Sequence, residues 1–254
     1  MVPNRKSRSF AAVHRWLQSP LGQALQETEA SVVEQAFDGI FGEYCLQLGL
    51  WGEPRAFLKF PRIRRTACLA DPENAVAGLQ PDTFGQPHLL PIASDTVDAV
   101  ILPHTLEFSE RPHAILREVH RVLRSDGHLI ILGFKPGGLW GMRRLFPGIG
   151  LPPAAEHLFS ERRLTDWLEL LDLRIHSSRR YFFRWPISGS HDSVSPVWER
   201  RGRRWWPELA ACYMLKAQKR LVALTPVRKP WLAPPKVVGG LEPTARVIHV
   251  RFDR

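Results

Sequence analysis

Two side chains that can move a proton, His104 and Glu107, follow a strongly apolar segment that ends at Leu102. His104 is the candidate base, because an unperturbed imidazole has a pKa near neutrality. Residues at this place lie at the carboxyl end of a predicted strand, the edge at which parallel sheets bind ligands. A second interpretation is that His104 only shapes the wall of a pocket.

The three cysteines, Cys45, Cys68 and Cys212, form no CxxC pair, and the sequence has no cluster with metal-ligand spacing. We therefore predict no metal and a reducing compartment. The longest apolar runs, such as 129–132, fall far short of the ~18 residues that span a bilayer. No apolar stretch of signal-peptide length follows the basic N-terminus. These features predict a cytoplasmic protein.

The chain has 254 residues and carries 35 Lys and Arg against 25 Asp and Glu, a formal net charge of +10. This charge permits an anionic partner such as RNA or an acidic membrane surface, and it says nothing about the fold.

Short apolar segments alternate with amphipathic helical stretches along most of the chain. Helical spacing runs from about residue 10 to 41, and Pro20 is predicted to begin a second helix there. The predicted strands cover 44–48, 66–70, 98–102, 128–134, 174–183 and 210–215, and two further helices cover 112–123 and 161–171. Such continuously apolar strands indicate a parallel sheet covered on both faces, the doubly wound α/β class.

The same reading divides the chain into three parts. Residues 1–41 form an N-terminal helical lid or extension, and residues 42–225 form the main domain. Residues 226–254, with five prolines and a Gly-Gly pair, form a basic and flexible tail.

The most informative stretch begins with Leu90-Pro91 and continues through Asp98 at the head of an apolar strand. It then runs through the helix LREVHRVL at 116–123 and the glycine turn at Gly127 into the strand at 128–131. This pattern resembles the class I S-adenosylmethionine-dependent methyltransferases of the type 11 family. The continuation through 134–141 and 205–220 is similar to a smaller bacterial branch of that family.

The resemblance implies a seven-stranded sheet that ends in an antiparallel hairpin, with S-adenosylmethionine lying across the carboxyl ends of the first strands. It implies that Asp98 pins the start of its strand, and that His104 and Glu107 face the methyl-transfer site as catalytic residues. The cofactor-binding positions that it implies are Gly49, Gly52, Asp71, Gln86, Leu90 and Pro103.

Within that set, Gly49 and Gly52 correspond to the glycine turn beside the methionine part of the cofactor. The acid that holds the ribose falls on Leu69 by simple register; Asp71, two residues later, takes that role if the loop is shifted, or else it caps a following helix. Gln86 corresponds to the contact with the adenine edge, or else it is a solvated loop residue. The sequence departs from the family pattern in its glycine turn and in the strand that precedes Asp71, where Gln47, Trp51 and Leu69 stand at positions that usually support the cofactor.

The function predicted is methyl transfer to a small or lipophilic acceptor, with the N-terminal helices and the loop 135–159 as a lid. One alternative is methylation of RNA or an RNA-associated protein. The other is a non-catalytic module that binds a partner. The arginines at 200–204 beside Trp205 and Trp206 fit nucleic acid, an anionic membrane, or a lid whose tryptophans close the core. The acceptor and the oligomeric state cannot be read from the sequence.

Overall fold

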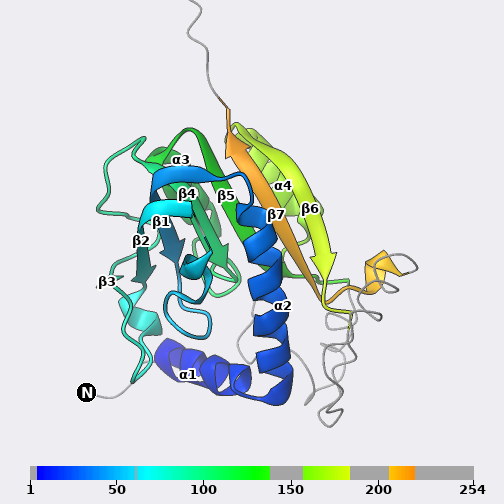
Figure 1. Cartoon of the computed structure of the whole chain (residues 1–254). Helices are drawn as coiled ribbons and strands as arrows, with labels where there is room; N and C mark the ends of the chain where they lie inside the picture. The colour runs from blue at the N-terminus through cyan, green and yellow to red at the C-terminus, as the bar shows by residue number, and fades with distance from the viewer. Residues whose placement is uncertain (1–4, 61, 138–156, 184–205, 221–254) are drawn as a thin grey trace, which may run out of the picture. The chain divides into compact units, whose positions relative to one another are not determined.

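A single twisted sheet runs through the computed structural model, which describes residues 5–60, 62–137, 157–183 and 206–220 (Figure 1). Its strands follow the spatial order β3-β2-β1-β4-β5-β7-β6. All neighbours pair in parallel except β7, which is antiparallel to both β5 and β6. The strands are β1 (Phe41–Leu48), β2 (Arg62–Ala70), β3 (Thr83–Phe84), β4 (Val97–Pro103), β5 (Leu123–Phe134), β6 (Leu173–Tyr181) and β7 (Cys212–Lys219).

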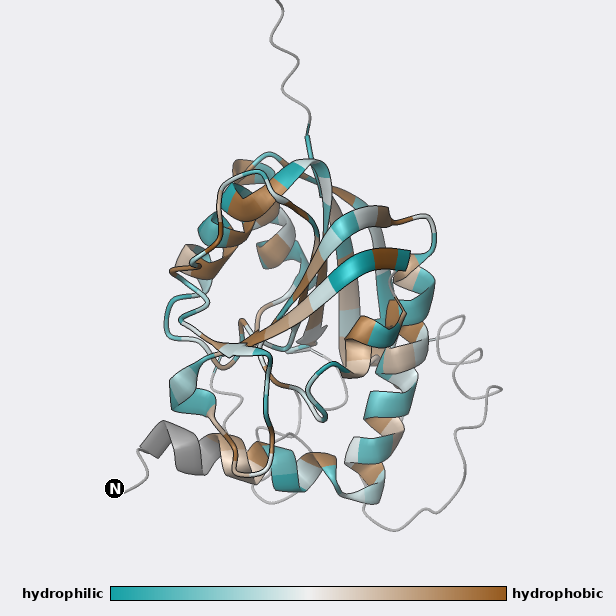
Figure 2. Ribbon diagram, turned by 60° about the vertical axis from the view of Figure 1, so that its left-hand side comes forward, coloured by the Kyte–Doolittle hydropathy of each residue, from teal (hydrophilic) through white to brown (hydrophobic). Residues whose placement is uncertain are grey.

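Both faces of the sheet are covered, as the near-continuous burial of β4 and β5 requires. Helices α3 (Pro112–Val122) and α4 (Glu161–Leu170) pack on one face, over Leu102, Leu129 and Ile131. Helices α1 (Arg5–Leu17) and α2 (Pro20–Phe37) pack on the other, where one core cluster joins them to Ile101 and Ile130. Figure 2 shows the apolar colouring concentrated on the central strands and on the inner sides of these helices.

The segment between β1 and β2 differs from an ordinary βαβ unit. A crossover between parallel strands usually contains an α-helix that covers the sheet. Here the described residues of the crossover contain only the short 3₁₀ helix η1 (Ala56–Lys59). Helix α2, which precedes β1 in the chain, lies in the same core cluster as η1 and helps to cover that face instead.

Helix α2 begins where the sequence predicts. Ser19 is its N-cap, with its hydroxyl accepting a hydrogen bond from Gly22 N, and Pro20 is its first residue. Helix α4 also begins as predicted, because Ser160 accepts from Arg163 N.

Asp98 ties the start of β4 to the start of β1. Its Oδ2 accepts from Glu43 N at 2.7 Å and from Tyr44 N at 2.9 Å, while Oδ1 pairs with Arg124 at 3.1 Å. A Cβ at Gly42 would overlap the Asp98 side chain, so only glycine fits beside it. These contacts agree with the structural role expected of Asp98.

The strand bounds differ from the predicted ones mainly at the amino ends. β1 and β2 begin three and four residues earlier than predicted, because polar and basic residues continue the pairing beyond the apolar core. The prediction missed β3, which has only two exposed residues. β7 runs from Cys212 to Lys219 rather than from Ala210.

None of the helices in the described part of the chain has the length and apolarity to cross a bilayer. The predicted tail at 226–254, most of the predicted loop at 135–159 and the arginines at 200–204 lie outside the described residues.

Candidate functional site

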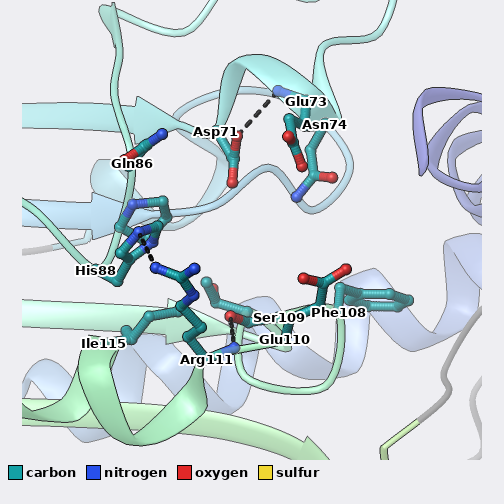
Figure 3. A pocket seen from close by; sticks show the side chains of 12 residues that line it. Asp71, Glu73, Asn74, Gln86, His88, Phe108, Ser109, Glu110, Arg111 and Ile115 are labelled. Atoms are coloured by element: carbon teal, nitrogen blue, oxygen red, sulfur yellow. Dashed lines mark hydrogen bonds between the residues drawn. The ribbon is translucent and has the colours of Figure 1, made fainter. Parts of the chain in front are cut away.

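A pocket of about 230 Å³ opens at the carboxyl ends of β2, β3 and β4. Asp71, Glu73 and Asn74 reach it from the loop after β2, and Gln86 reaches it from the loop after β3. The segment after β4 closes the opposite side with Thr105, Ser109, Glu110 and Arg111. Figure 3 shows Asp71 and Asn74 across the pocket from Ser109 and Glu110.

Asp71 has two roles in this structure. Its Oδ1 accepts a hydrogen bond from Glu73 N at 2.9 Å, which caps the short 3₁₀ helix η2 (Pro72–Asn74). The same side chain lines the pocket. The two interpretations considered for this residue, a ribose ligand and a cap, are therefore compatible with each other.

The turn after β1 contains two glycines in the left-handed region, Gly49 at φ +95° and Gly52 at φ +71°. A Cβ at Gly49 would lie 2.7 Å from Oγ1 of Thr105, and one at Gly52 would overlap the amide oxygen of Gln26. Thr105 also donates to Leu48 O and lines the pocket. The glycine turn thus lies beside the pocket, separated from it by Thr105.

Gln47, just before this turn, leaves a buried acceptor unused. Its Nε2 donates to Gly49 O at 3.1 Å. Its Oε1 is buried and has no hydrogen-bond partner in the described part of the structure. Buried polar atoms are rarely left unsatisfied, so Gln47 Oε1 marks a place suited to a donor.

Behind the turn, a fully buried network joins three ionisable side chains. His104 lies between two carboxylates, with Nε2 2.7 Å from Glu29 Oε1 and Nδ1 2.8 Å from Glu107 Oε2. Phe134 N donates to the other oxygen of Glu107 at 2.5 Å. Glu29 also accepts from Trp51 Nε1 at 2.6 Å and from the Tyr181 hydroxyl at 3.2 Å.

The network is enclosed by aromatic rings. The rings of Trp51 and Phe134 each lie 4.2 Å from the His104 ring, centroid to centroid. His104 itself has a φ of +54°, which turns the chain sharply after β4. As a result, the imidazole points into the core rather than into the pocket of Asp71 and Gln86, and it is 0% exposed.

Charge dominates the protonation of this network. Burial alone lowers the pKa of His104, but the carboxylates of Glu29 and Glu107 outweigh burial and raise that pKa to about 9. His104 is therefore an imidazolium at neutral pH and donates to both carboxylates. Burial raises the pKa of Glu107, against the opposing attraction of His104. Burial and the nearby Glu29 carboxylate raise the pKa of Tyr181 well above its ordinary value.

Comparison with known proteins identifies the domain. Residues 72–131 match the model of the type 11 methyltransferase domain. A segment of 60 residues is 42% identical to the malonyl-[acyl-carrier protein] O-methyltransferase of Laribacter hongkongensis, covering 24% of this chain and 20% of that protein. The chain carries a type 11 methyltransferase domain. The match spans η2, β3, β4, α3 and most of β5, and so includes the segment after β4 that lines the pocket.

Over most of its length the methyltransferase chain is similar to Escherichia coli protein YafS, with 28% identity across 89% of this chain and 88% of that protein. Solved class I methyltransferases share the fold. A SAM-dependent methyltransferase from Aquifex aeolicus superposes with a TM-score of 0.51 at 15% identity, covering 85% of this chain and 98% of that one. Geranyl diphosphate methyltransferase in complex with SAM superposes with a TM-score of 0.52 at 12% identity, covering 81% of this chain and 94% of that one. The expected seven-stranded sheet with its terminal antiparallel hairpin is confirmed.

The residues at the pocket fit the adenosine half of S-adenosylmethionine. A carboxylate that can accept from ribose hydroxyls (Asp71) and an amide that can pair with an adenine edge (Gln86) line one cavity. Gln47 Oε1 adds an unused buried acceptor at the adjoining turn, suited to an ammonium donor. The missing Cβ at Gly49 leaves room for the Thr105 side chain, which itself lines the pocket.

The other predicted site residues take different places. Leu90 is buried under α3, and its N–H donates to Glu118 Oε2 at 2.9 Å. Pro103 is buried at the end of β4. His104 and Glu107 are joined to each other in the core, and their catalytic role remains a prediction. Trp206 is 58% exposed, and the rest of its basic segment lies outside the described residues.

Sequence reasoning missed Glu29, which the structure places at the centre of the network. A signal for it was present in helix α2. Glu29 lies four residues after Leu25 and three before Val32, so a carboxylate interrupts the apolar stripe that faces the sheet. A buried carboxylate in such a stripe requires partners, but the stripe does not say which ones.

Proposed function

We propose that the protein transfers a methyl group from S-adenosylmethionine to a small or lipophilic acceptor. The observation that carries the proposal is the shared pocket of Asp71 and Gln86 at the carboxyl edge of the sheet. Parallel sheets bind their ligands at this edge, where the strand order reverses between β1 and β4. The type 11 domain supplies the reaction class.

In this proposal the cofactor, when bound, supplies a methyl group activated by a sulfonium. Asp71 accepts from the ribose hydroxyls, and Gln86 contacts the adenine edge. The backbone at Gly49 and the acceptor of Gln47 hold the amino acid end. Displacement at a methyl group needs alignment of the reacting atoms more than it needs acid–base groups. The chain therefore acts mainly by orienting its ligands and excluding water.

A second candidate function is a non-catalytic module, and one observation favours it. Both ring nitrogens of His104 are bound to carboxylates, and Trp51 packs against the ring. In this conformation neither ring nitrogen can take a proton from a methyl acceptor. A protein that binds the cofactor and never turns it over would fit this arrangement.

Calorimetric titration with S-adenosylmethionine and S-adenosylhomocysteine tests the proposal. The informative variant is Asp71→Asn, because asparagine still caps η2 but lacks the carboxylate charge. We expect micromolar binding to the wild type and a loss of about tenfold or more in the variant, since a hydrogen bond to a charged group is worth ~1.5–3 kcal/mol. Glu53→Gln, an exposed residue outside the pocket lining, is the matched control and should bind as the wild type does.

Absence of binding to folded wild-type protein at millimolar ligand would refute the proposal. Equal affinity in Asp71→Asn and wild type would refute the assignment of the ribose site. Binding without methyl transfer to any acceptor from a broad set of amines, alcohols and carboxylic acids would favour the non-catalytic module.

A further inference from the structure

Glu29 is the point at which α2 meets three separate strand ends. Its two oxygens accept from Trp51 in the turn after β1, from His104 after β4 and from Tyr181 at the end of β6. All three partners lie at the carboxyl edge of the sheet, because β6 runs parallel to β4 and β5. The side chain is 0% exposed, so bulk solvent does not reach these bonds.

Helix α2 also holds the glycine turn at a second point. Gln26, one turn before Glu29 on the same side of the helix, places its amide oxygen where a Cβ of residue 52 would be. Gln26 is fixed in turn by its Nε2, which donates to Leu17 O at 2.8 Å. The turn at 49–52 is therefore held from α2, whereas the described crossover after it contains no α-helix that could do so.

Only a carboxylate satisfies the partners of Glu29. The indole N–H, the phenol O–H and the imidazolium N–H are three donors that converge on two oxygens. An amide at this position would direct its own N–H₂ at one of those donors. The residue type is thus dictated by the three groups it joins, two of which flank the proposed cofactor site.

We propose that Glu29 is a positioning residue of the methyl-donor site, which fixes the glycine turn through Trp51 and the end of β4 through His104. This inference rests on the proposed function. It assigns to α2, a helix outside the matched segment 72–131, a part in binding the donor. The competing interpretation is that the network stabilises the fold and leaves ligand affinity unaffected.

A change in the charge of His104 can distinguish a positioning role of Glu29 from a role in fold stability alone. The titratable groups that face its ring are Glu29 from α2 and Glu107 from the turn after β4, and Tyr181 from β6 bonds the same carboxylate. Loss of the His104 proton at alkaline pH removes the ion pair with Glu29. Glu29→Gln removes the same ion pair at neutral pH. If Glu29 positions the site, these two changes should have the same effect on donor affinity.

The experiment compares wild type, Glu29→Gln and the control Glu27→Gln, which changes an exposed glutamate two residues away on the same helix. Nitrogen-15 NMR of the ligand-free proteins follows the ring nitrogens of His104 and the indole N–H of Trp51, the latter assigned with Trp51→Phe. Titration with S-adenosylhomocysteine follows affinity from about pH 7 to 10. Urea unfolding shows that each variant is folded.

We expect Glu29→Gln to move the Trp51 signal and to lower the pH at which His104 titrates. We expect its affinity for S-adenosylhomocysteine to fall about tenfold, equivalent to about 1.4 kcal/mol. The wild type should lose the same factor as the pH rises through about 9, the pKa of His104. The affinity of Glu29→Gln should start lower and fall less over that range, because only the ammonium of the ligand still titrates, and Glu27→Gln should behave as the wild type.

Three results would overturn the inference. One is a folded Glu29→Gln protein that binds within twofold of the wild type. Another is an affinity that falls with pH equally in both proteins. The third is an unmoved Trp51 signal, which counts even if the wild type binds no S-adenosylhomocysteine. Failure of the wild type to bind contradicts the proposed function, while the ligand-free spectra still decide whether Glu29 holds the turn.

Discussion

The free energy of unfolding should fall on the alkaline side because His104 loses its proton. Folding raises the pKa of His104 from 6.5 to about 9, a difference of roughly 2.5 pH units that is worth roughly 3 kcal/mol at ~1.36 kcal/mol per unit. A pKa raised by folding stabilises the native state fully below the unfolded value. That stabilisation is then lost as the pH rises through about 9.

Most of this loss of stability occurs within a pH range that can be studied in solution. Between about pH 7.5 and pH 10, the linkage relation removes roughly 2 kcal/mol of the contribution. Ordinary carboxyl groups stay ionised throughout this window, so their titration adds little. Exposed lysines and tyrosines do titrate there, and for that reason the wild type is compared with His104→Gln, which keeps those groups and lacks the imidazolium.

The assay is urea unfolding at half-unit steps of pH, with the midpoint and slope fitted at each step. The free energies of unfolding of wild type and His104→Gln should differ most at neutral pH. The difference between them should decrease by roughly 2 kcal/mol toward pH 10. The left-handed backbone at residue 104 strains histidine and glutamine alike and does not change with pH. Parallel curves for the two proteins would refute the charged state assigned to His104.

Three further substitutions test the scaffold around the site. Asp98→Ala removes two backbone hydrogen bonds and an ion pair from the start of β1, and urea unfolding should show a loss of about 1–2 kcal/mol with S-adenosylhomocysteine affinity unchanged. Gly49→Ala places a Cβ at φ +95° against Thr105, so it should cost about 1–2 kcal/mol from backbone strain alone and also weaken ligand binding in calorimetry. Ser160→Ala removes the N-cap of α4, on the far face from α2, and should lower the thermal midpoint through a loss of about 1 kcal/mol with no change in affinity. Loss of affinity in Ser160→Ala, or a neutral Gly49→Ala, would contradict this account.

The part of the fold that local pattern determines could be predicted from the sequence. The segment from β4 to β5 carries buried residues on both faces of its strands and a single apolar stripe on α3, so the fold class follows directly from this pattern. Ser19-Pro20 and Ser160 mark helix starts through bonds within one turn. β3 escaped prediction because two exposed residues carry no periodicity.

The candidate site divides in the same way. Asp71 follows a strand that could be located from its pattern, whereas Gln86 follows the missed strand β3 and was placed only by the family resemblance; both line the pocket. The imidazole of His104 points into the core because residue 104 has a positive φ. None of the neighbouring residues in the sequence predicts that backbone conformation. Its partner Glu29 lies 75 residues earlier in the chain. No local pattern joins residues so far apart, and a single sequence contains no other measure of their contact.

The span of the Glu29 network has a consequence for synthesis on the ribosome. Tyr181 follows Glu29 by 152 residues, which the ribosome adds in roughly 8 to 30 s at ~5–20 residues per second. Until that interval ends, the Glu29 carboxylate in the apolar stripe of α2 lacks one of its three donors, although Trp51 and His104 have already been added. The hydrogen-bond network of Glu29 is therefore complete only after β6 has been synthesised. A nascent chain that stalls before β6 would keep the Glu29 carboxylate one donor short inside the apolar side of α2.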